Sequence, residues 1–345
     1  MLSHSGRARH TVPRSVHDGR PVRIALVGCG VIGAIYRAAL NTLPLFELVG
    51  VCDSDPTKAT TTAAWGAPFF ERLDRLIEAA QPEAVVITAP NDRHAELCSQ
   101  ALEAGVSVCC EKPLALAPTD AERLQADARR RGLSLLTAYH RRYNRNFLQL
   151  VRARAGRAIR HLEVFYLERI EEHCGLDSWY LQPERVGGGC LADNGPNALD
   201  TAMALLGPLT VSACRVRRPA AGPELQATVD LRANDGATVT CVLDWAYQRG
   251  ELKGVVAHLR DASALRSDFL AGFPAFKSSL DHEYAAILQA FAATLRPAGR
   301  GGPSGTPDRE RALFPPDGAA VARLVADCYR LERSDSRLQA REVQL

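Results

Sequence analysis

Short apolar runs alternate with amphipathic stretches through the first part of the chain. Val22–Val27 is β-branched and apolar, which is typical of a buried parallel strand, and the helical pattern after it stops before Pro44. The same rhythm of strand and helix repeats as far as Ala138 and predicts a doubly wound parallel sheet that is covered on both faces. The further expected strands are Phe46–Cys52, Ala84–Thr88, Val106–Cys110 and Leu133–Ala138, and the further expected helices are Thr57–Ala64, Leu73–Ala80, Arg93–Ala104 and Pro118–Arg131.

The rhythm changes after about Arg142, where long strand-like runs follow one another with few helices between them. One clear helix is expected at Pro196–Leu206, with Asn194 as its N-cap, and another at Gly318–Leu331. This α/β pattern predicts a parallel-sheet domain at residues 22–142 and, at residues 143–345, an α+β domain with a large, open, mostly antiparallel sheet. Residues 1–21 are expected to be a disordered tail, and residues 301–316 a surface loop rich in Gly and Pro. The expected strands of the second sheet are Ile159–Ile170, Leu209–Val216, Leu225–Leu231, Thr238–Trp245 and Gly254–Arg260.

Composition adds limits on partners. The 345 residues are 46% hydrophobic and 23% charged, which is typical of a globular chain of about two domains. The net charge of +3 is too balanced to require nucleic acid as a partner. No apolar stretch approaches the ~18 residues that cross a bilayer, and the Arg-rich first residues lack the apolar core of a secretory signal. We expect neither nucleic acid nor a membrane as a partner.

The ten cysteines are expected to be free structural thiols. The chain has no C-x-x-C pair and no histidine at zinc-finger spacing, which argues against a metal site. Free cysteines behave as small hydrophobic residues, and their use in the core is typical of a reducing, cytoplasmic compartment. Those in or beside apolar runs are Cys29, Cys52, Cys109, Cys110, Cys214 and Cys241.

A glycine-rich turn, Gly28-x-Gly30-x-x-Gly33, joins the first predicted strand to the first predicted helix. Here Gly28 permits the tight turn, Gly30 lets the backbone approach a pyrophosphate, and Gly33 lets the helix pack on the strand. Asp53 ends the next strand, where its carboxylate can accept hydrogen bonds from both ribose hydroxyls and would repel a 2′-phosphate. The pattern therefore predicts a Rossmann-type dinucleotide site that favours NAD over NADP.

Polar residues follow two more strands of the predicted parallel sheet. Asn91 and His94 come after one strand, and Glu111 and Lys112 come after the next. Ligands of doubly wound sheets bind outside the carboxyl ends of the strands, so these residues are expected near a nicotinamide. A lysine beside a cofactor can act as an acid or a base, although Lys112 taken alone also fits an ordinary surface lysine before a proline.

A third polar cluster lies at the helix expected in the second domain. Asp193 precedes that helix and Asn197 follows one turn later, so both side chains can face the same space. Taken alone, Asp193 and Asn194 also fit the role of helix caps.

Together these clusters resemble the glucose–fructose oxidoreductase / inositol dehydrogenase / MocA family of sugar dehydrogenases. The resemblance extends from Val22 nearly to Leu345. The matching features are the Gly28–Gly33 turn, Pro90-Asn91 with His94, Glu111-Lys112-Pro113, Arg141-Arg142-Tyr143, Trp179, the Gly187–Asp200 segment and the Gly318–Leu331 helix.

This resemblance implies a Rossmann domain and an α/β domain whose open sheet often forms the interface of a homodimer or homotetramer. It also implies that Lys112 contacts both the substrate and the nicotinamide ribose. The expected catalytic residues are Lys112, Asp193 and Asn197. The residues expected to bind NAD are Gly28, Gly30, Val31, Ile32, Gly33, Asp53, Pro90, Asn91, His94, Glu111, Lys112 and Trp179. The residues expected to bind substrate are His140, His173, Tyr180, Asp193, Asn197 and Tyr284.

One departure from the family pattern concerns the general base. The family has Asp-x-x-x-His here, with the histidine as the base, whereas this chain has Asp193 followed by Asn197. An asparagine has no proton to exchange near neutral pH and can only orient a hydroxyl. Three interpretations remain open. Lys112 relays the proton with the help of Asp193, or the protein has lost redox activity and binds nucleotide as a sensor, or another group is the base: His140, His173, Tyr180 or Tyr284.

The resemblance implies NAD-dependent oxidation of a secondary hydroxyl on a sugar-like ring, or reduction of the corresponding ketone. The segment Glu168–Asp177 borders the substrate cleft in the family, and its four carboxylates could attract a cationic amino sugar or aminoglycoside intermediate. The alternative is a solvated loop and a neutral sugar or cyclitol. A redox-assisted glycosidase or lyase, which keeps its NAD, is a further interpretation.

Overall fold

The computed structural model describes residues 20–174, 178–220, 222–273, 275, 277–295 and 317–342. The expected tail up to residue 19, the expected loop 301–316, Asp177 and the side chain of His173 lie outside the described residues. No helix in the described part of the chain is long and apolar enough to cross a membrane. The nine described cysteines are free and buried.

The first half of the chain forms a six-stranded sheet in the order β3-β2-β1-β4-β5-β6. All of its pairs are parallel, which confirms the doubly wound sheet expected from the sequence. The strand order reverses between β1 and β4, and such a reversal opens a crevice at the carboxyl edge of the sheet. The strands are β1 Val22–Val27, β2 Phe46–Cys52, β3 Phe69–Phe70, β4 Ala84–Ile87, β5 Ser107–Glu111 and β6 Leu135–Ala138.

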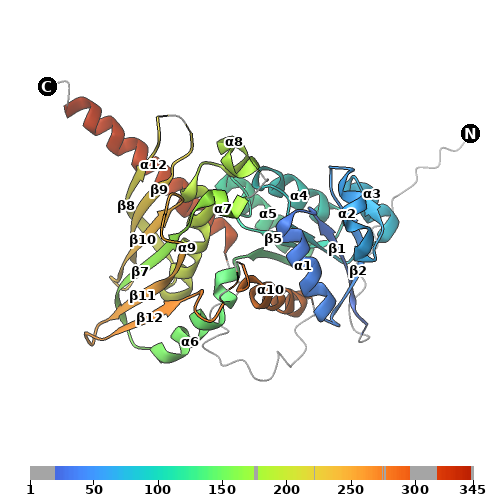
Figure 1. The fold of residues 1–345 in the computed structure, drawn as a ribbon, viewed down its shortest axis with the longest axis horizontal. Helices are drawn as coiled ribbons and strands as arrows, with labels where there is room; N and C mark the ends of the chain where they lie inside the picture. Colours follow the sequence, from blue (N-terminus) through green and yellow to red (C-terminus); the bar gives the residue numbers. More distant parts are fainter. Residues whose placement is uncertain are drawn as a thin grey trace, which may run out of the picture.

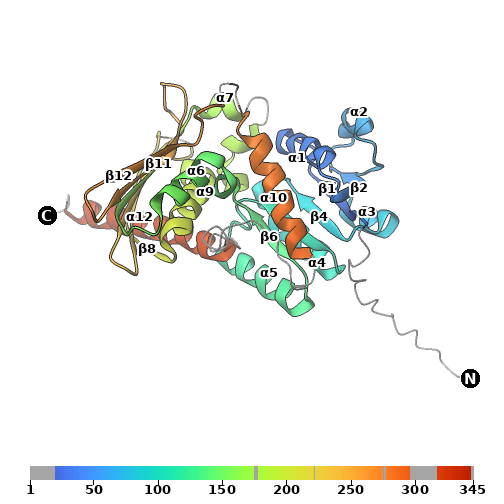
Figure 2. The same ribbon diagram turned by 90° about the horizontal axis from the view of Figure 1, so that it is seen from below.

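Helices cover both faces of this sheet (Figure 1). One face packs against α3, α4, α5 and the start of α12, and the other packs against α1 and α10. Helix α10 comes from the far end of the sequence but lies beside α1, as Figure 2 shows. The helices are α1 Val31–Thr42, α2 Lys58–Thr62, α3 Leu73–Ala80, α4 His94–Glu103, α5 Pro118–Arg131, α10 Leu280–Leu295 and α12 Gly318–Glu342, with 3-10 turns η1 Ala63–Trp65 and η2 Asn91–Arg93.

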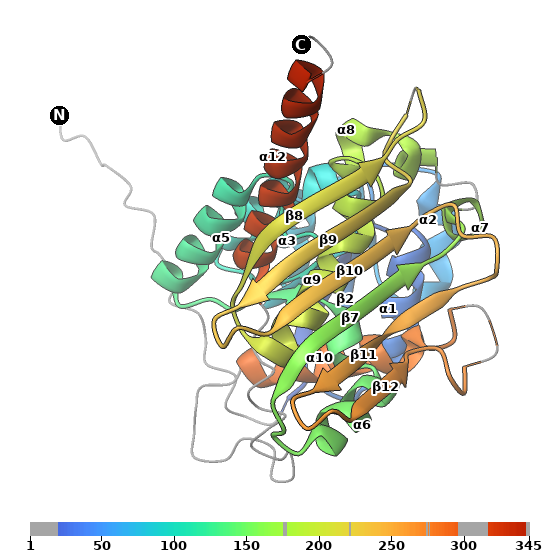
Figure 3. The same ribbon diagram turned by 90° about the vertical axis from the view of Figure 1, so that its left-hand side faces the viewer.

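The second sheet has the order β12-β11-β7-β10-β9-β8. The pair of β7 and β10 is parallel and the other pairs are antiparallel, so the expected mostly antiparallel sheet is confirmed. No described helix covers the face that is turned to the viewer in Figure 3. Its strands are β7 Ile159–Leu167, β8 Leu209–Arg217, β9 Gln226–Ala233, β10 Thr238–Asp244, β11 Leu252–Leu259 and β12 Ala264–Asp268.

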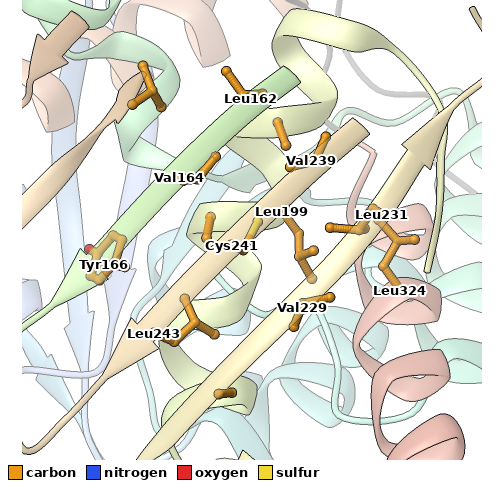
Figure 4. Packing of buried hydrophobic residues seen from close by; sticks show 14 of the residues in the cluster. Leu162, Val164, Tyr166, Leu199, Val229, Leu231, Val239, Cys241, Leu243 and Leu324 are labelled. Carbon is orange, nitrogen blue, oxygen red and sulfur yellow. The ribbon is translucent and has the colours of Figure 1, made fainter. Parts of the chain in front are cut away.

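The inner face of this sheet forms the second core with α9 and α12. Leu162, Val164 and Tyr166 alternate along β7 and point to this face, in one cluster with Leu199 of α9 and with Leu324 of α12, which lies beside Leu231 of β9 (Figure 4). Alternate residues of a strand share one face, so the row places the Tyr166 side chain in line with two core residues. The other helices of this half are η3 His140–Tyr143, α6 Arg145–Arg154, α7 Ile170–Cys174, η4 Ser178–Leu181, α8 Pro183–Val186 and α9 Cys190–Leu206.

Helix α9 begins earlier than its sequence suggests. It starts at Cys190 with Gly189 as N-cap, and Pro196 lies inside it, so the expected start at Pro196 with Asn194 as cap is wrong. The physical reason is a distant cap: Glu224 Oε1 accepts hydrogen bonds from the backbone N–H groups of Gly189 at 2.7 Å and Leu191 at 3.3 Å. These bonds satisfy N–H groups that a helix start leaves without partners.

Candidate active site

The glycine turn is shaped for close approach by a ligand. Gly28 has φ +97, and a Cβ atom there would lie 2.7 Å from the backbone nitrogen of Ala89. A Cβ atom at Gly33 would lie 2.2 Å from the carbonyl oxygen of Gly28, whereas at Gly30 it would meet no described atom within 4 Å. Gly28 and Gly33 are therefore needed by the fold itself, and Gly30 leaves open space above the turn. That space belongs to a cavity of ≈ 1170 Å³ that Gly28, Gly30, Val31, Ile32, Asp53 and Pro90 help to line.

The start of α1 and the end of β2 fit a dinucleotide in this cavity. Gly30 is the N-cap of α1, and no side chain of the described residues caps it, so backbone N–H groups and the helix dipole face the cavity for a pyrophosphate. Asp53 Oδ2 accepts a hydrogen bond from the Cys29 N–H at 2.7 Å, and Oδ1 accepts one from the Asp55 N–H at 2.9 Å. Each carboxylate oxygen keeps a second lone pair that can accept a ribose hydroxyl.

We expect alanine to have opposite effects at Gly30 and Gly33. In Gly33→Ala the new Cβ collides with the Gly28 carbonyl, so the free energy of unfolding falls by roughly 1–3 kcal/mol. In Gly30→Ala the free protein is unstrained, but the methyl group occupies ligand space, so NAD binds about tenfold or more weakly with unchanged stability. Thermal unfolding and calorimetry separate the two effects. Wild-type NAD affinity in Gly30→Ala would contradict the assignment of the cavity.

A smaller polar pocket of ≈ 130 Å³ lies between the carboxyl edge of the first sheet and the inner face of the second. Lys112 at the end of β5 reaches across it, and its Nζ donates to Asp193 Oδ1 at 2.6 Å and to the Asp193 carbonyl oxygen at 3.0 Å. Burial acts to lower the pKa of Lys112, but the Asp193 carboxylate and other negative neighbours outweigh it and raise the pKa above its usual value. Lys112 is thus held as an ammonium ion that donates hydrogen bonds.

Asn197 lies one turn after Asp193 on α9 and lines the same pocket. Its Nδ2 donates to Tyr166 Oη at 3.3 Å. Its Oδ1 is buried and has no hydrogen-bond partner among the described residues. An unpartnered buried acceptor is costly, and a ligand hydroxyl or amine in the pocket would satisfy it.

Glu111 lies beside Lys112 at the first-sheet side of the pocket. It is buried and accepts hydrogen bonds from Tyr36 Oη at 3.0 Å and from the Lys112 backbone N–H at 3.3 Å. Burial raises the pKa of Glu111 to about 7. Its negative charge is therefore only partly present at neutral pH, and the side-chain ion pair of Lys112 is formed with Asp193 at 2.6 Å.

The segment after β6 and helix α10 supply the next wall. His140 Nδ1 and Glu283 Oε2 are 2.5 Å apart, and Arg141 Nη1 donates to Glu283 Oε1 at 3.0 Å. Burial lowers the pKa of His140 to about 4, and Arg141 acts in the same direction, so His140 is neutral at pH 7. Glu283 stays ionised, because Arg141 and His140 outweigh its burial and lower its pKa to about 2. Tyr284 stacks on His140 with ring centroids 5.7 Å apart.

Asn91 and His94 bind backbone carbonyl groups near the carboxyl edge of the first sheet, and Asn91 reaches the second domain. Asn91 Nδ2 donates to the Val186 carbonyl oxygen at 3.2 Å. His94 is fully buried, with Nδ1 2.6 Å from the Pro113 carbonyl oxygen and Nε2 2.8 Å from that of Ala89. These contacts let Asn91 and His94 hold the strand-end loops in place. Their contact with a cofactor stays a prediction.

The aromatic pair Trp179 and Tyr180 lies where the two cavities meet. The rings stack with centroids 3.9 Å apart, and both residues line both cavities. The Arg185 guanidinium lies 6.0 Å from the Trp179 ring centroid and 3.6 Å from Asp92 Oδ1, which ties this segment to the first domain.

The expected gathering of carboxylates at the cleft is wrong for Glu171 and Glu172 and holds for Glu168. Glu171 and Glu172 are exposed and face Arg169 at 3.8 and 3.6 Å. Glu168 does line the pocket, but its Oε2 lies 2.5 Å from Lys253 Nζ. The fourth, Asp177, lies outside the described residues. Glu171 and Glu172 thus face Arg169 of the same segment, and Glu168 is paired with the distant Lys253, so these three carboxylates do not make the pocket acidic.

The site contains residues that sequence reasoning did not select. Tyr166 and Lys253 line the pocket, and Asn194 Nδ2 donates to Glu168 Oε1 at 2.9 Å instead of capping α9. The alternation of β7 places Tyr166 on the inner face, which is the one signal that could have found it. Its hydroxyl reaches the pocket because that end of β7 lies beside α9, where Asn197 donates to it.

Comparison with known proteins assigns the chain to a family. A model described as the oxidoreductase family, NAD-binding Rossmann fold, matches residues 22–139, and the GFO/IDH/MocA C-terminal domain matches residues 147–263. The chain belongs to the GFO/IDH/MocA oxidoreductase family. This confirms both the resemblance seen in the sequence and the NAD-binding Rossmann domain.

Relatives within the GFO/IDH/MocA family act on several polyols. D-glucoside 3-dehydrogenase of Escherichia coli (strain K12) is 33% identical over 202 residues, which cover 56% of this chain and 56% of the relative. Myo-inositol dehydrogenase Hyg17 of Streptomyces leeuwenhoekii is 37% identical over 141 residues, 39% of this chain and 42% of the relative. The chain thus matches about half of the length of such curated relatives. The crystal structure of GenD2 from gentamicin A biosynthesis in complex with NAD has the same fold, with a TM-score of 0.79 and 24% identity over 94% of this chain and 97% of that chain.

Proposed function

We propose that the protein is an NAD-dependent dehydrogenase that oxidises a secondary hydroxyl on a sugar-like ring, or reduces the corresponding ketone. The observation that carries this proposal is the junction of the two cavities. Ile32, Thr88, Ala89, Trp179 and Tyr180 line both the dinucleotide cavity and the polar pocket. A nicotinamide at this junction would face a substrate held by Lys112, Asp193 and Asn197.

The chain's own residues would position the reacting hydroxyl. The nicotinamide, when bound, supplies the hydride acceptor or donor, and the protein supplies orientation and electrostatics. Lys112, which Asp193 holds as an ammonium ion, donates a hydrogen bond to the substrate oxygen and stabilises negative charge that develops there. The unpartnered Oδ1 of Asn197 accepts a hydrogen bond from a hydroxyl or an amine. The raised pKa of Lys112 argues against the interpretation in which it gives up its own proton.

The proposal favours NAD over NADP. Asp53 ends β2 at the wall of the dinucleotide cavity, and a 2′-phosphate would lie against its carboxylate. Arg72 lines the same cavity, but its Nη2 pairs with Asp74 at 2.6 Å. GenD2, which shares the fold, was solved with NAD.

For the substrate we propose an amino sugar or an aminoglycoside-type intermediate. The support is the relation to GenD2 of gentamicin A biosynthesis and the free acceptor on Asn197, which suits an amine as well as a hydroxyl. The segment Glu168–Asp177 does not support this substrate, because its described carboxylates are paired with Arg169 and Lys253. We further propose a homodimer or homotetramer formed through the uncovered face of the second sheet (Figure 3).

An absorbance assay at the NADH band tests the function. Purified protein is incubated with NAD and, one at a time, with the members of a substrate panel. The panel contains neutral sugars, cyclitols, amino sugars and aminoglycoside pseudosaccharides. We expect NADH to accumulate with at least one class of substrate. If the substrate is an amino sugar or an aminoglycoside-type intermediate, NADH accumulates with the amine-bearing members. Turnover of neutral polyols alone would contradict the amino-sugar proposal. Binding of NAD without NADH from any member would contradict the dehydrogenase and favour a sensor or a lyase that keeps its cofactor.

A further inference from the structure

The proposed reaction leaves one proton without an acceptor. Oxidation of an alcohol removes a hydride from carbon and a proton from oxygen, and the family's histidine is replaced here by Asn197. Lys112 is held as an ammonium ion by the 2.6 Å pair with Asp193. Some other group in the pocket must therefore exchange the proton.

We propose that Tyr166 is this group and exchanges the proton of the substrate hydroxyl in place of a histidine at position 197. This inference rests on the proposed dehydrogenase function. Tyr166 lines the polar pocket with Lys112, Asp193 and Asn197. It reaches the pocket because the inward-facing row of Leu162, Val164 and Tyr166 on β7 ends beside α9, as Figure 4 shows.

The hydrogen bonds of Tyr166 leave its proton available to a ligand. Tyr166 Oη accepts from Asn197 Nδ2 at 3.3 Å, so Asn197 holds the phenol in the space beside itself. No described residue accepts a hydrogen bond from the Tyr166 hydroxyl, and its other hydrogen-bonding neighbour, Arg141, can only donate. A substrate oxygen in the pocket would be the partner of that hydroxyl hydrogen. The interaction would place Tyr166 on the atom that gains or loses the proton.

Three cations lie close to Tyr166. Lys253 Nζ lies 4.9 Å and the Arg141 guanidinium 5.6 Å from the Tyr166 ring centroid. Lys112 is an electrostatic neighbour of the same phenol. Each of these cations is also paired with a carboxylate, Lys112 with Asp193, Arg141 with Glu283 and Lys253 with Glu168, but each lies close enough to attract negative charge that develops on the phenol oxygen during the transfer. Asn197 adds a hydrogen bond to the same oxygen.

In the direction of oxidation, the Tyr166 hydroxyl first releases its proton to solvent. The substrate O–H bond then breaks, and its proton passes to the Tyr166 oxygen. The electron pair of the O–H bond stays on the substrate oxygen and forms the C=O bond, while the carbon gives its hydride to the oxidised nicotinamide cofactor. In the direction of reduction, the Tyr166 hydroxyl returns the proton to the carbonyl oxygen.

His140 is the competing candidate in the same pocket. Its Nδ1 faces Glu283, an arrangement in which a carboxylate holds an imidazole as a base. Its low pKa of about 4 makes it a weak proton acceptor, because burial and Arg141 disfavour the imidazolium. The Tyr166 hydroxyl, by contrast, lies beside Asn197, and no described residue accepts its hydrogen. The geometry therefore favours Tyr166.

The test compares Tyr166→Phe with wild type and with Tyr247→Phe, a tyrosine outside the pocket. The substrate is the panel member that wild type turns over fastest. We expect Tyr166→Phe to lower kcat by about 10²-fold or more, with NAD and sugar dissociation constants, measured by calorimetry, within about threefold of wild type. Tyr166→Phe/Asn197→His is expected to recover at least about tenfold of the loss, because an imidazole then lies beside the vacated hydroxyl.

The outcomes separate the role of Tyr166 from the proposed function. A kcat of Tyr166→Phe within about threefold of wild type would overturn the role of Tyr166 in proton transfer and leave the proposed dehydrogenase function standing. If Tyr166→Phe lost kcat and sugar affinity equally, and Asn197→His recovered neither, Tyr166 would have a binding role. That result would also overturn its role in proton transfer. A large loss of kcat in His140→Gln with none in Tyr166→Phe would assign the proton to His140. A wild type that turns over no panel member would instead contradict the proposed function itself.

Discussion

Lys112→Ala is expected to lower kcat by about 10²-fold or more, the usual effect of removing one preorganised donor at a developing negative charge. The Lys112 ammonium is the one cation that both faces the substrate and is held by Asp193 at 2.6 Å among the described residues. The variant loses the hydrogen bond that orients the substrate oxygen. Steady-state kinetics with NAD and the best panel substrate measure the effect.

The control for Lys112→Ala addresses folding. Removal of Lys112 leaves Asp193 buried and without its counter-charge, which is itself destabilising. The double variant Lys112→Ala/Asp193→Asn removes that charge and should regain stability without regaining turnover. Arg123→Ala, on the exposed face of α5, should keep wild-type kinetics. Turnover of Lys112→Ala within a few-fold of wild type would exclude Lys112 from the chemistry.

Glu283→Ala is expected to lower the free energy of unfolding by roughly 3–5 kcal/mol, because breaking a buried ion pair leaves an uncompensated charge. Glu283 is fully buried on α10 and holds Arg141, His140 and Asn144 together. The change leaves the Arg141 guanidinium, only 3% exposed, without its carboxylate. Chemical denaturation measures the effect.

A surface ion pair provides the matched control for Glu283→Ala. Glu122 pairs with Arg323 at 2.6 Å, but both side chains are about half exposed. Glu122→Ala should therefore change the free energy of unfolding by at most about 1 kcal/mol. A loss of that small size in Glu283→Ala as well would contradict the role of Glu283 as the anchor between α10 and the segment after β6.

Local patterns in the sequence predict the first domain well. Helices α3 and α5 have the bounds that their apolar periodicity and flanking residues indicate, and the Gly28–Gly33 turn lies between β1 and α1 as expected. These features are set by neighbours in the chain: a period of 3.6, a proline at the start of α5 and Gly132 at its end. The edge of the sheet that carries Lys112 follows from strand order alone.

Contacts between distant segments account for the remainder. The apolar residues of α10 recur at helical spacing, but nothing nearby indicates that this helix covers the first sheet beside α1. The side chain that accepts hydrogen bonds from the start of α9 belongs to Glu224, which lies 35 residues after the N-cap residue Gly189. Likewise, Lys253 is the counter-charge of Glu168, and only the pairing of β7 with β11 brings these two residues together.

A crystal structure with NAD and the best substrate bound tests the proposed chemistry most directly. We expect a substrate hydroxyl within hydrogen-bonding distance of Lys112 Nζ and Tyr166 Oη, with its carbon against the nicotinamide. We also expect a hydroxyl or amine of the substrate on Asn197 Oδ1. A substrate bound outside the Lys112–Asp193–Asn197 pocket, or a nicotinamide turned away from the junction of the two cavities, would contradict it.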